Sequence, residues 1–179
     1  GDSLADVHNL VILSRFPICS VIELKHTLIS PLAYQCVTSM PNDTTPRPIF
    51  FERPALVAEV ALKSSAKLTV INLHLRAPLA SAIAGQKHSP FSWKSTSGWA
   101  EGFFLSSLKR SAQALEIRFA LDNILDADPH RLIAICGDFN AEDHETPIKI
   151  LQAAEEDTGN GHLASRSLVI ADRALSQDR

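Results

Sequence analysis

The sequence lacks the features that mark the more unusual classes of protein. Its 179 residues include only three cysteines, seven glycines and one methionine, and aromatic residues make up 6%. No run of about 18 apolar residues occurs, which argues against a transmembrane helix. There is no Gly-X-Y period and no sustained heptad pattern, so collagen-like and coiled-coil rods are excluded. The N-terminal residues lack the charged-then-apolar pattern of a secretion signal, and we expect a cytoplasmic protein.

The cysteines and histidines do not form a recognisable metal or redox motif. Cys19, Cys36 and Cys136 are scattered and form no CxxC pair, which argues against a zinc knuckle or a thioredoxin-type centre. Cys136 ends an apolar run, so we expect a small buried side chain there. The seven histidines show no HExxH or paired-ligand spacing, which disfavours a zinc enzyme.

What is present is ordinary globular composition, with 45% hydrophobic and 21% charged residues, and it predicts one domain over residues 1–179. The net charge of -3 argues against a protein that coats nucleic acid. Residues 1–110 nevertheless carry 11 basic against 7 acidic side chains, and residues 111–179 carry 6 against 13. This asymmetry fits either two differently solvated surfaces or an anionic ligand held over the basic half, near carboxylates able to hold a metal.

Alternation and periodicity predict a few well-defined elements. Ala55–Lys63 and Lys67–His74 alternate between apolar and polar residues, and the tight connection Ser64-Ser65-Ala66 between them indicates an antiparallel hairpin. The second strand turns polar at Asn72 and His74, which we expect at a sheet edge. Leu132–Cys136 is continuously apolar, which is typical of a strand buried on both faces.

Residues 103–125 predict the principal helix, which Asp128 and Pro129 close. Its apolar residues follow a helical period, and we expect them to face the core: Phe104, Leu108, Ala112, Leu115 and Phe119. The polar residues of the same helix, which we expect on a solvated face, include Lys109, Arg110, Gln113 and Arg118.

The remaining segments predict loops and short elements. The apolar run Asn9–Ser14 precedes Pro17, which should end central strand pairing. Residues 31–54 and 78–102 predict long loops, the first with a short strand at residues 49–51. Thr146 and Pro147 predict the cap and first residue of a helix that runs to about Ala154.

Two polar side chains follow the predicted strand at residues 132–136. The segment Gly137-Asp138-Phe139-Asn140-Ala141 delivers Asp138 and Asn140 to the carboxyl end of the sheet, where ligands bind in open α/β sheets. An aspartate can activate water or help to hold a divalent cation, and an asparagine can donate to a phosphate oxygen. The alternative is an Asx turn that only caps the strand.

A second polar group ends the strand at residues 67–74. His74 could contact a phosphate oxygen or protonate a leaving group, and Arg76, two residues further on, could offer a charged fork. The alternative is a structural histidine with satisfied hydrogen bonds.

Taken together, three segments resemble the endonuclease/exonuclease/phosphatase superfamily. They are Leu13-Ser14-Arg15-Phe16-Pro17-Ile18, then Asn72-Leu73-His74-Leu75, then the Gly137–Ala141 block, which is the most specific. This superfamily includes pancreatic deoxyribonuclease, abasic-site endonucleases, neutral sphingomyelinases and inositol-polyphosphate phosphatases. The resemblance extends from about Asn9 to the end of the chain.

The resemblance implies an α/β (α+β) fold, a four-layer sandwich of two mainly antiparallel sheets flanked by helices. It also implies phosphoester hydrolysis with Mg²⁺ or Mn²⁺. By motif match, His74 would contact the scissile phosphate, Asp138 would orient or activate water, and Asn140 would stabilise the developing charge. Asp138 and Asn140 are the candidate metal ligands, and the candidate substrate-binding residues are Asn72, Arg76, Lys87 and Trp99. The substrate class, with nucleic acid among the candidates, is not set by these motifs.

Two departures from the family pattern affect the expected activity. The chain has no Gln-Glu dipeptide to supply the family's metal-binding glutamate, and its only Asp-His is Asp143-His144, directly after the Gly137–Ala141 block. We therefore interpret the chain as the central portion of a family domain, and expect it to bind Mg²⁺ poorly and to be weakly active by itself. The alternative is a degenerate, non-catalytic member that serves as a binding module.

Overall fold

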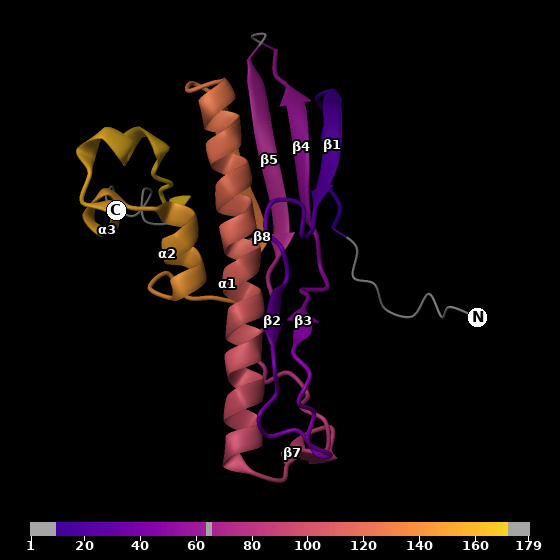
Figure 1. The fold of residues 1–179 in the computed structure, drawn as a ribbon. Coiled ribbons are helices and arrows are strands. Elements are labelled where there is room, and N and C mark those ends of the chain that lie inside the picture. The colour runs from indigo at the N-terminus through magenta and orange to yellow at the C-terminus, as the bar shows by residue number, and fades with distance from the viewer. Residues whose placement is uncertain (1–9, 64–65, 172–179) are drawn as a thin grey trace, which may run out of the picture.

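The structure, a computed structural model, describes residues 10–63 and 66–171. Figure 1 shows one long helix lying along a twisted sheet. In chain order the elements are β1 (Ile18–Leu24), β2 (Leu32–Tyr34), β3 (Arg47–Ile49), β4 (Ala55–Ala61), β5 (Lys67–His74), β6 (Lys87–Ser89), β7 (Ser92–Trp93), α1 (Thr96–Ala127), β8 (Leu132–Asp138), α2 (Thr146–Gln152), α3 (Glu155–Thr158) and a 3-10 helix (Gly161–Arg166).

The main sheet has four strands in the order β1-β4-β5-β8. The β1–β4 and β4–β5 pairs are antiparallel, which confirms the predicted hairpin, and the β5–β8 pair is parallel. Two further two-stranded sheets, β2–β3 and β6–β7, lie beside the N-terminal half of α1 (Figure 1). The mixed α/β class is therefore confirmed, as an α+β arrangement of a mainly antiparallel sheet and helices. Of the four layers that the resemblance implies, the described residues show one four-stranded sheet, two small two-stranded sheets and the helices beside them. No helix among the described residues combines the length and apolarity needed to cross a membrane.

One face of the sheet packs against α1 and forms the core. Strand residues alternate between the two faces, so Val57, Ile71 and Leu73 point toward the helix. They pack in one cluster with Ala114 and Ile117 of α1. Ile71 is completely buried and Leu73 is 1% exposed, so the centre of β5 is the centre of the core.

Strand β8 differs from the prediction of a strand buried on both faces. It forms the edge of the sheet, and only Ile133 and Ile135 pack against the core. Leu132, Ala134 and Cys136 point to the other face and are exposed, so Cys136 is not the buried side chain that we expected. The apolar run identified a strand correctly but could not show whether its second face is covered.

Several boundaries also differ from the sequence predictions. Pro17 does not end a strand but precedes one, because β1 begins at Ile18. The short strand expected at residues 49–51 lies at Arg47–Ile49. Helix α2 has Glu145 as its N-cap, so Thr146 is its first helical residue, and it ends at Gln152. Asn9 and residues 64 and 65 of the predicted hairpin connection lie outside the described residues.

Helix α1 buries a different face from the one predicted. It begins at Thr96, capped by the Ser95 hydroxyl, and ends before Asp128. Of the predicted core stripe, Phe104 is 48% and Phe119 42% exposed, and the other members are only half-buried or exposed. The buried face instead carries Leu105, Ile117 and Leu121 together with charged and polar groups: Glu101, Arg110, Gln113, Glu116 and Arg118.

These buried polar side chains satisfy loop backbone groups. The Glu116 carboxylate accepts hydrogen bonds from the backbone N–H groups of residues 26, 27 and 28, at 2.9, 2.5 and 2.8 Å. Glu101 accepts from the backbone of Val37 and Thr38 in the same way, at 2.5 and 2.9 Å. A buried carboxylate is costly unless such donors surround it, so α1 and these loops depend on each other.

Candidate functional site

His74 and Asp138 come together at the carboxyl ends of β5 and β8. The two strands are parallel, and His74 is the register partner of Asp138. The His74 Nε2 atom lies 3.5 Å from the Asp138 Oδ2 atom, and the two side chains are 26% and 60% exposed. A titratable imidazole and a carboxylate therefore meet at the rim of the sheet, within reach of solvent.

Gly137 allows this close approach of the two strands. Its φ is +123°, and a Cβ at this position would lie 2.0 Å from the Leu73 carbonyl oxygen and 2.9 Å from the Asn72 amide oxygen. Every other residue would therefore both clash with the backbone of β5 and strain its own backbone. The glycine of the Gly137–Ala141 block is thus explained by strand packing.

Asn140 joins the same group through a tight turn. Its backbone N–H donates to Asp138 Oδ1 at 2.9 Å, which is the Asx turn considered above. Its side-chain Nδ2 donates to the Leu75 carbonyl oxygen at 2.9 Å, and the Leu75 N–H donates to the Asp138 carbonyl oxygen at 2.9 Å. Because the Asx turn is what holds Asn140 beside the end of β5, a turn and a polar site are compatible here.

The structure places Asn72 and Arg76 near this group, but both are partly engaged. The Asn72 amide donates to the Val11 carbonyl oxygen at 3.1 Å. The Arg76 backbone N–H donates to Gln113 Oε1 at 2.8 Å, while its side-chain Nε is buried without a hydrogen-bond partner in the described part of the chain.

Lys87 and Trp99 lie elsewhere. Lys87 Nζ donates to the Pro90 carbonyl oxygen at 2.7 Å and sits over the Trp93 ring, 4.7 Å from its centroid. Trp99 stacks on Phe103 in the first turns of α1, with the ring centroids 5.5 Å apart. Trp99 precedes Arg110, whose guanidinium donates to the Asn140 carbonyl oxygen, by eleven residues, or about 16 Å along the helix axis. A ligand that touches both regions must therefore be extended.

The described residues supply little of a metal site. Within residues 10–63 and 66–171, no group of three or more His, Cys, Asp or Glu side chains could hold a metal ion. At the strand ends, Asp138 is one carboxylate and Asn140 one amide oxygen, whereas Mg²⁺ takes six oxygen ligands with near-ideal geometry. These residues by themselves do not fit a resident Mg²⁺.

Arg110 and Gln113 of α1 also belong to this region, although the sequence predicted a solvated face. They are 5% and 6% exposed. Arg110 donates from Nη1 to the Asn140 carbonyl oxygen, and Gln113 bridges the two loops at Arg53 and Arg76. Arg110, Gln113 and Glu116 are spaced three residues apart, so they share one face of the helix, and this spacing was the sequence signal that could have identified the buried polar face. The hydropathy pattern predicted that the opposite face is buried.

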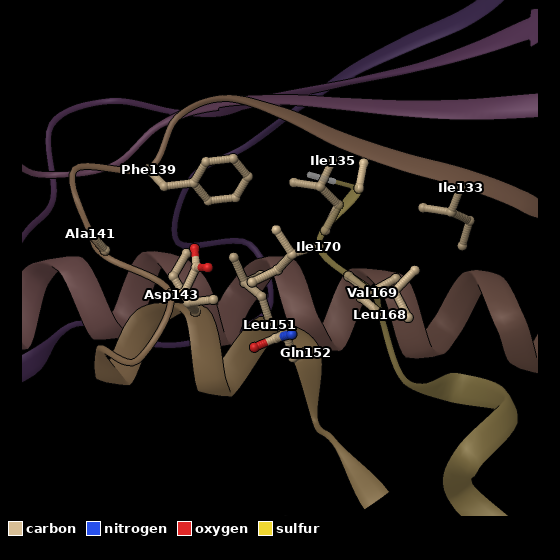
Figure 2. Close-up of a pocket in the computed structure, with 12 residues that line it drawn as sticks. Ile133, Ile135, Phe139, Ala141, Asp143, Leu151, Gln152, Leu168, Val169 and Ile170 are labelled. Atoms are coloured by element: carbon tan, nitrogen blue, oxygen red, sulfur yellow. The ribbon is translucent and has the colours of Figure 1, made fainter. Parts of the chain in front are cut away.

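An apolar pocket lies on the helical side of β8, separate from the polar group. It has a volume of about 380 Å³, and Asp143 and Gln152 are the polar residues that line it. Figure 2 shows Phe139 reaching into it from the loop after β8, beside Ile135 and Ile170. Phe139 therefore anchors the loop in the apolar pocket. Its neighbours Asp138 and Asn140 lie with His74 in the polar group at the strand ends.

Comparisons of the chain with protein-family models, with curated proteins and with solved structures find no match.

Proposed function

We propose that this chain carries part of the site of a metal-dependent phosphoester hydrolase of the endonuclease/exonuclease/phosphatase type. The observation that supports the proposal most strongly is the meeting of His74, Asp138 and Asn140 at one end of the sheet. They come from segments more than sixty residues apart, with 3.5 Å between His74 Nε2 and Asp138 Oδ2. The resemblance of both segments to the superfamily motifs supports the same function.

In this proposal each side chain has a distinct role at a phosphate. His74, when protonated, donates from Nε2 to a non-bridging phosphate oxygen. The Asp138 carboxylate orients a water and accepts its proton. The second N–H of the Asn140 amide, whose first is directed at Leu75, donates to the oxygen on which negative charge develops. The dependence on Mg²⁺ or Mn²⁺ rests on the resemblance, and Asp138 is the carboxylate that this chain would contribute.

The first test measures binding, because we expect slow turnover from residues 1–179 alone. Titration with dimethyl phosphate, followed by NMR, should shift the His74 ring and Asn140 amide signals. His74→Ala should weaken binding by about tenfold, the loss of one charged hydrogen bond. His130→Ala is the matched control, since His130 is exposed on the loop before β8. Equal affinity of the two variants would contradict the assigned site.

The second test measures turnover. Hydrolysis is measured with and without Mg²⁺ or Mn²⁺ on four substrates: bis(p-nitrophenyl) phosphate, DNA, RNA and phospholipid vesicles. The comparison also identifies the substrate class. Residues 1–179 should show slow cation-dependent turnover, and Asp138→Asn should reduce it to the level of a protein-free control, a loss of up to roughly 10²-fold in kcat, the scale of losing one positioned acid–base group. Glu142→Gln, on the same exposed loop, should leave it unchanged. Phosphate binding without cation-dependent turnover would support the binding-module alternative instead.

A further inference from the structure

We infer that Arg110 of α1 is a positioning residue, which fixes the position of Asn140 relative to a bound phosphate. Gln113, on the same helix, fixes the segment that follows β5. The inference rests on the proposed function only in naming the ligand as a phosphoester. Each side chain acts through backbone groups: Arg110 contacts the Asn140 carbonyl oxygen, and Gln113 contacts the Arg76 N–H just after His74.

Arg110 contacts the Asn140 turn from the α1 side. Its guanidinium donates from Nη1 to the Asn140 carbonyl oxygen, and its Nη2 lies 3.5 Å from Glu145 Oε1. Asn140 has a φ of +48°, a left-handed conformation that asparagine adopts more readily than other non-glycine residues but less readily than the right-handed one. A tether on its carbonyl oxygen therefore opposes relaxation of the turn.

Gln113 holds the strand that faces this turn. Gln113 lies three residues after Arg110, which is nearly one helical turn, so both side chains point to the same side of α1. Its Nε2 donates to the Arg53 carbonyl oxygen at 3.1 Å, and its Oε1 accepts from the Arg76 N–H at 2.8 Å. The segment after β5 is thus fixed just beyond His74, on the same helix that fixes Asn140.

The two tethers converge on Leu75. The Leu75 carbonyl oxygen accepts the Asn140 side-chain amide at 2.9 Å, so the direction of that amide depends on both segments. Loss of the Arg110 contact would release the Asn140 carbonyl and allow its side chain to leave Leu75. The second amide hydrogen, which the proposed function directs at phosphate, would then lose its orientation.

The energetics of Arg110 also favour a positioning role over simple stabilisation. A buried arginine stabilises a fold only when all its N–H groups are satisfied. The Arg110 Nε is buried and has no hydrogen-bond partner within the described part of the chain. An apolar residue of similar volume at this position could therefore stabilise the fold as well as arginine or better. It could not donate a hydrogen bond to the Asn140 carbonyl oxygen.

The experiment compares Arg110→Met with Arg118→Met in residues 1–179. Arg118 is the matched control, since it is 6% exposed on the same helix and holds carbonyl oxygens of Leu151 and Arg166, away from the phosphate site. Arg110→Lys retains a charge and a donor and tests rescue. Three quantities are measured: the melting temperature, the dissociation constant of dimethyl phosphate, and the NMR signals of the Asn140 side-chain amide.

We expect Arg110→Met to weaken dimethyl phosphate binding by about tenfold or more, as misplaced binding groups do, and to move the Asn140 amide signals toward those of a solvated amide. Arg118→Met should change only the melting temperature, and Arg110→Lys should restore part of the affinity. Unchanged Asn140 signals in Arg110→Met would overturn the inference. If the wild type binds no phosphate, the proposed function fails, while the Asn140 signals still decide the positioning role.

Discussion

Gly137 is the residue at which β8 comes closest to β5. Its positive φ, and the 2.0 Å that would separate an added Cβ from the Leu73 oxygen, show that backbone, rather than a movable side chain, occupies the space. Gly159 offers a natural comparison, since it also has a positive φ, of +62°, but nothing lies within 4 Å of its Cβ position. Alanine at Gly159 would meet only the strain of a left-handed backbone, whereas alanine at Gly137 would meet a backbone clash and a φ outside the left-handed region.

We predict that Gly137→Ala lowers the free energy of unfolding by at least about 3 kcal/mol, the upper end for single substitutions, because it adds both a clash and backbone strain. Gly159→Ala should cost only about 1 kcal/mol, the strain of a left-handed backbone. Urea denaturation followed by circular dichroism gives both values. Similar losses for the two variants would show that the strands can separate at Gly137 without cost.

Asp122 makes part of the stability depend on pH. Hydrogen bonds from Arg118, with a smaller contribution from Arg166, lower the pKa of the Asp122 carboxyl below its usual value, although partial burial acts in the opposite direction. The Arg118 Nε donates to Asp122 Oδ2 at 3.0 Å. Because the folded pKa is the lower one, the stabilisation is present above the unfolded pKa of about 3.9 and is lost as the pH falls through the folded pKa.

Asp122→Asn should therefore reduce the free energy of unfolding by about 1 kcal/mol at pH 7, the upper end for a partly exposed pair. The difference from wild type should shrink as the pH falls below about 4, because the Asp122 carboxyl is then protonated in the unfolded state but still charged in the folded state, and it should shrink further as the pH falls through the lower folded pKa. Denaturant titrations at pH 7, 5, 4 and 3 measure this. A difference that stays constant over this range would mean that the charge of Asp122 is not the stabilising feature.

At the scale of elements, β5 has one face in the core and one face half-buried. Ile71 points toward α1 and is completely buried, while its neighbour Val70 points to the other face and is half-buried. We predict that Ile71→Ala costs about 2–5 kcal/mol and that Val70→Ala costs clearly less. Equilibrium unfolding of both variants checks the assignment, and equal losses would indicate that both faces of β5 are equally packed.

Helix α1 shows why hydropathy found the element but not its buried face. The 3.6-residue period of Phe104, Leu108 and Leu115 correctly predicted a helix. The choice of face depended on where Glu101, Arg110 and Glu116 find partners, and those partners are backbone groups of loops far away in sequence. The spacing of Arg110, Gln113 and Glu116 shows that they share a helical face, but it does not show that loops distant in sequence would bury that face.

The polar group at the strand ends was more predictable, because its local signals were short motifs. The alternation of β5 predicted the position of His74, and a strand followed by Gly-Asp-Phe-Asn predicted the position of Asp138. The parallel pairing of β5 with β8, which brings the two side chains together, is a finding of the structure. The sequence could not show that β8 is an edge strand, because its apolar residues suit either environment.

At the scale of the whole molecule, the sheet face opposite α1 presents a partly exposed apolar surface. Antiparallel and parallel register place Val21, Ala58, Val70 and Ala134 in one row across the four strands. Ala58 and Val60 are buried at the centre of this face, whereas Val21 is 53% and Leu132 50% exposed near its two edges. The same face ends in the His74–Asp138 pair, so the polar group forms the rim of an apolar surface.

This surface should bind an apolar dye while the protein remains folded. We predict that the native protein enhances the fluorescence of anilinonaphthalene sulfonate, and that the double variant Val21→Lys and Leu132→Lys lowers this enhancement. Both positions lie on edge strands, where lysine is well tolerated, so the free energy of unfolding should change by no more than about 0.5 kcal/mol per substitution. Val37→Lys is the control, since Val37 is 74% exposed, lies in the loop between β2 and β3 and does not line the apolar pocket beside β8. Near-ultraviolet circular dichroism verifies that each variant keeps its packing. If the double variant and the control bind the dye as the wild type does, the dye-binding surface lies elsewhere, and the exposed stripe of α1 around Phe104 and Phe119 becomes the surface to substitute next.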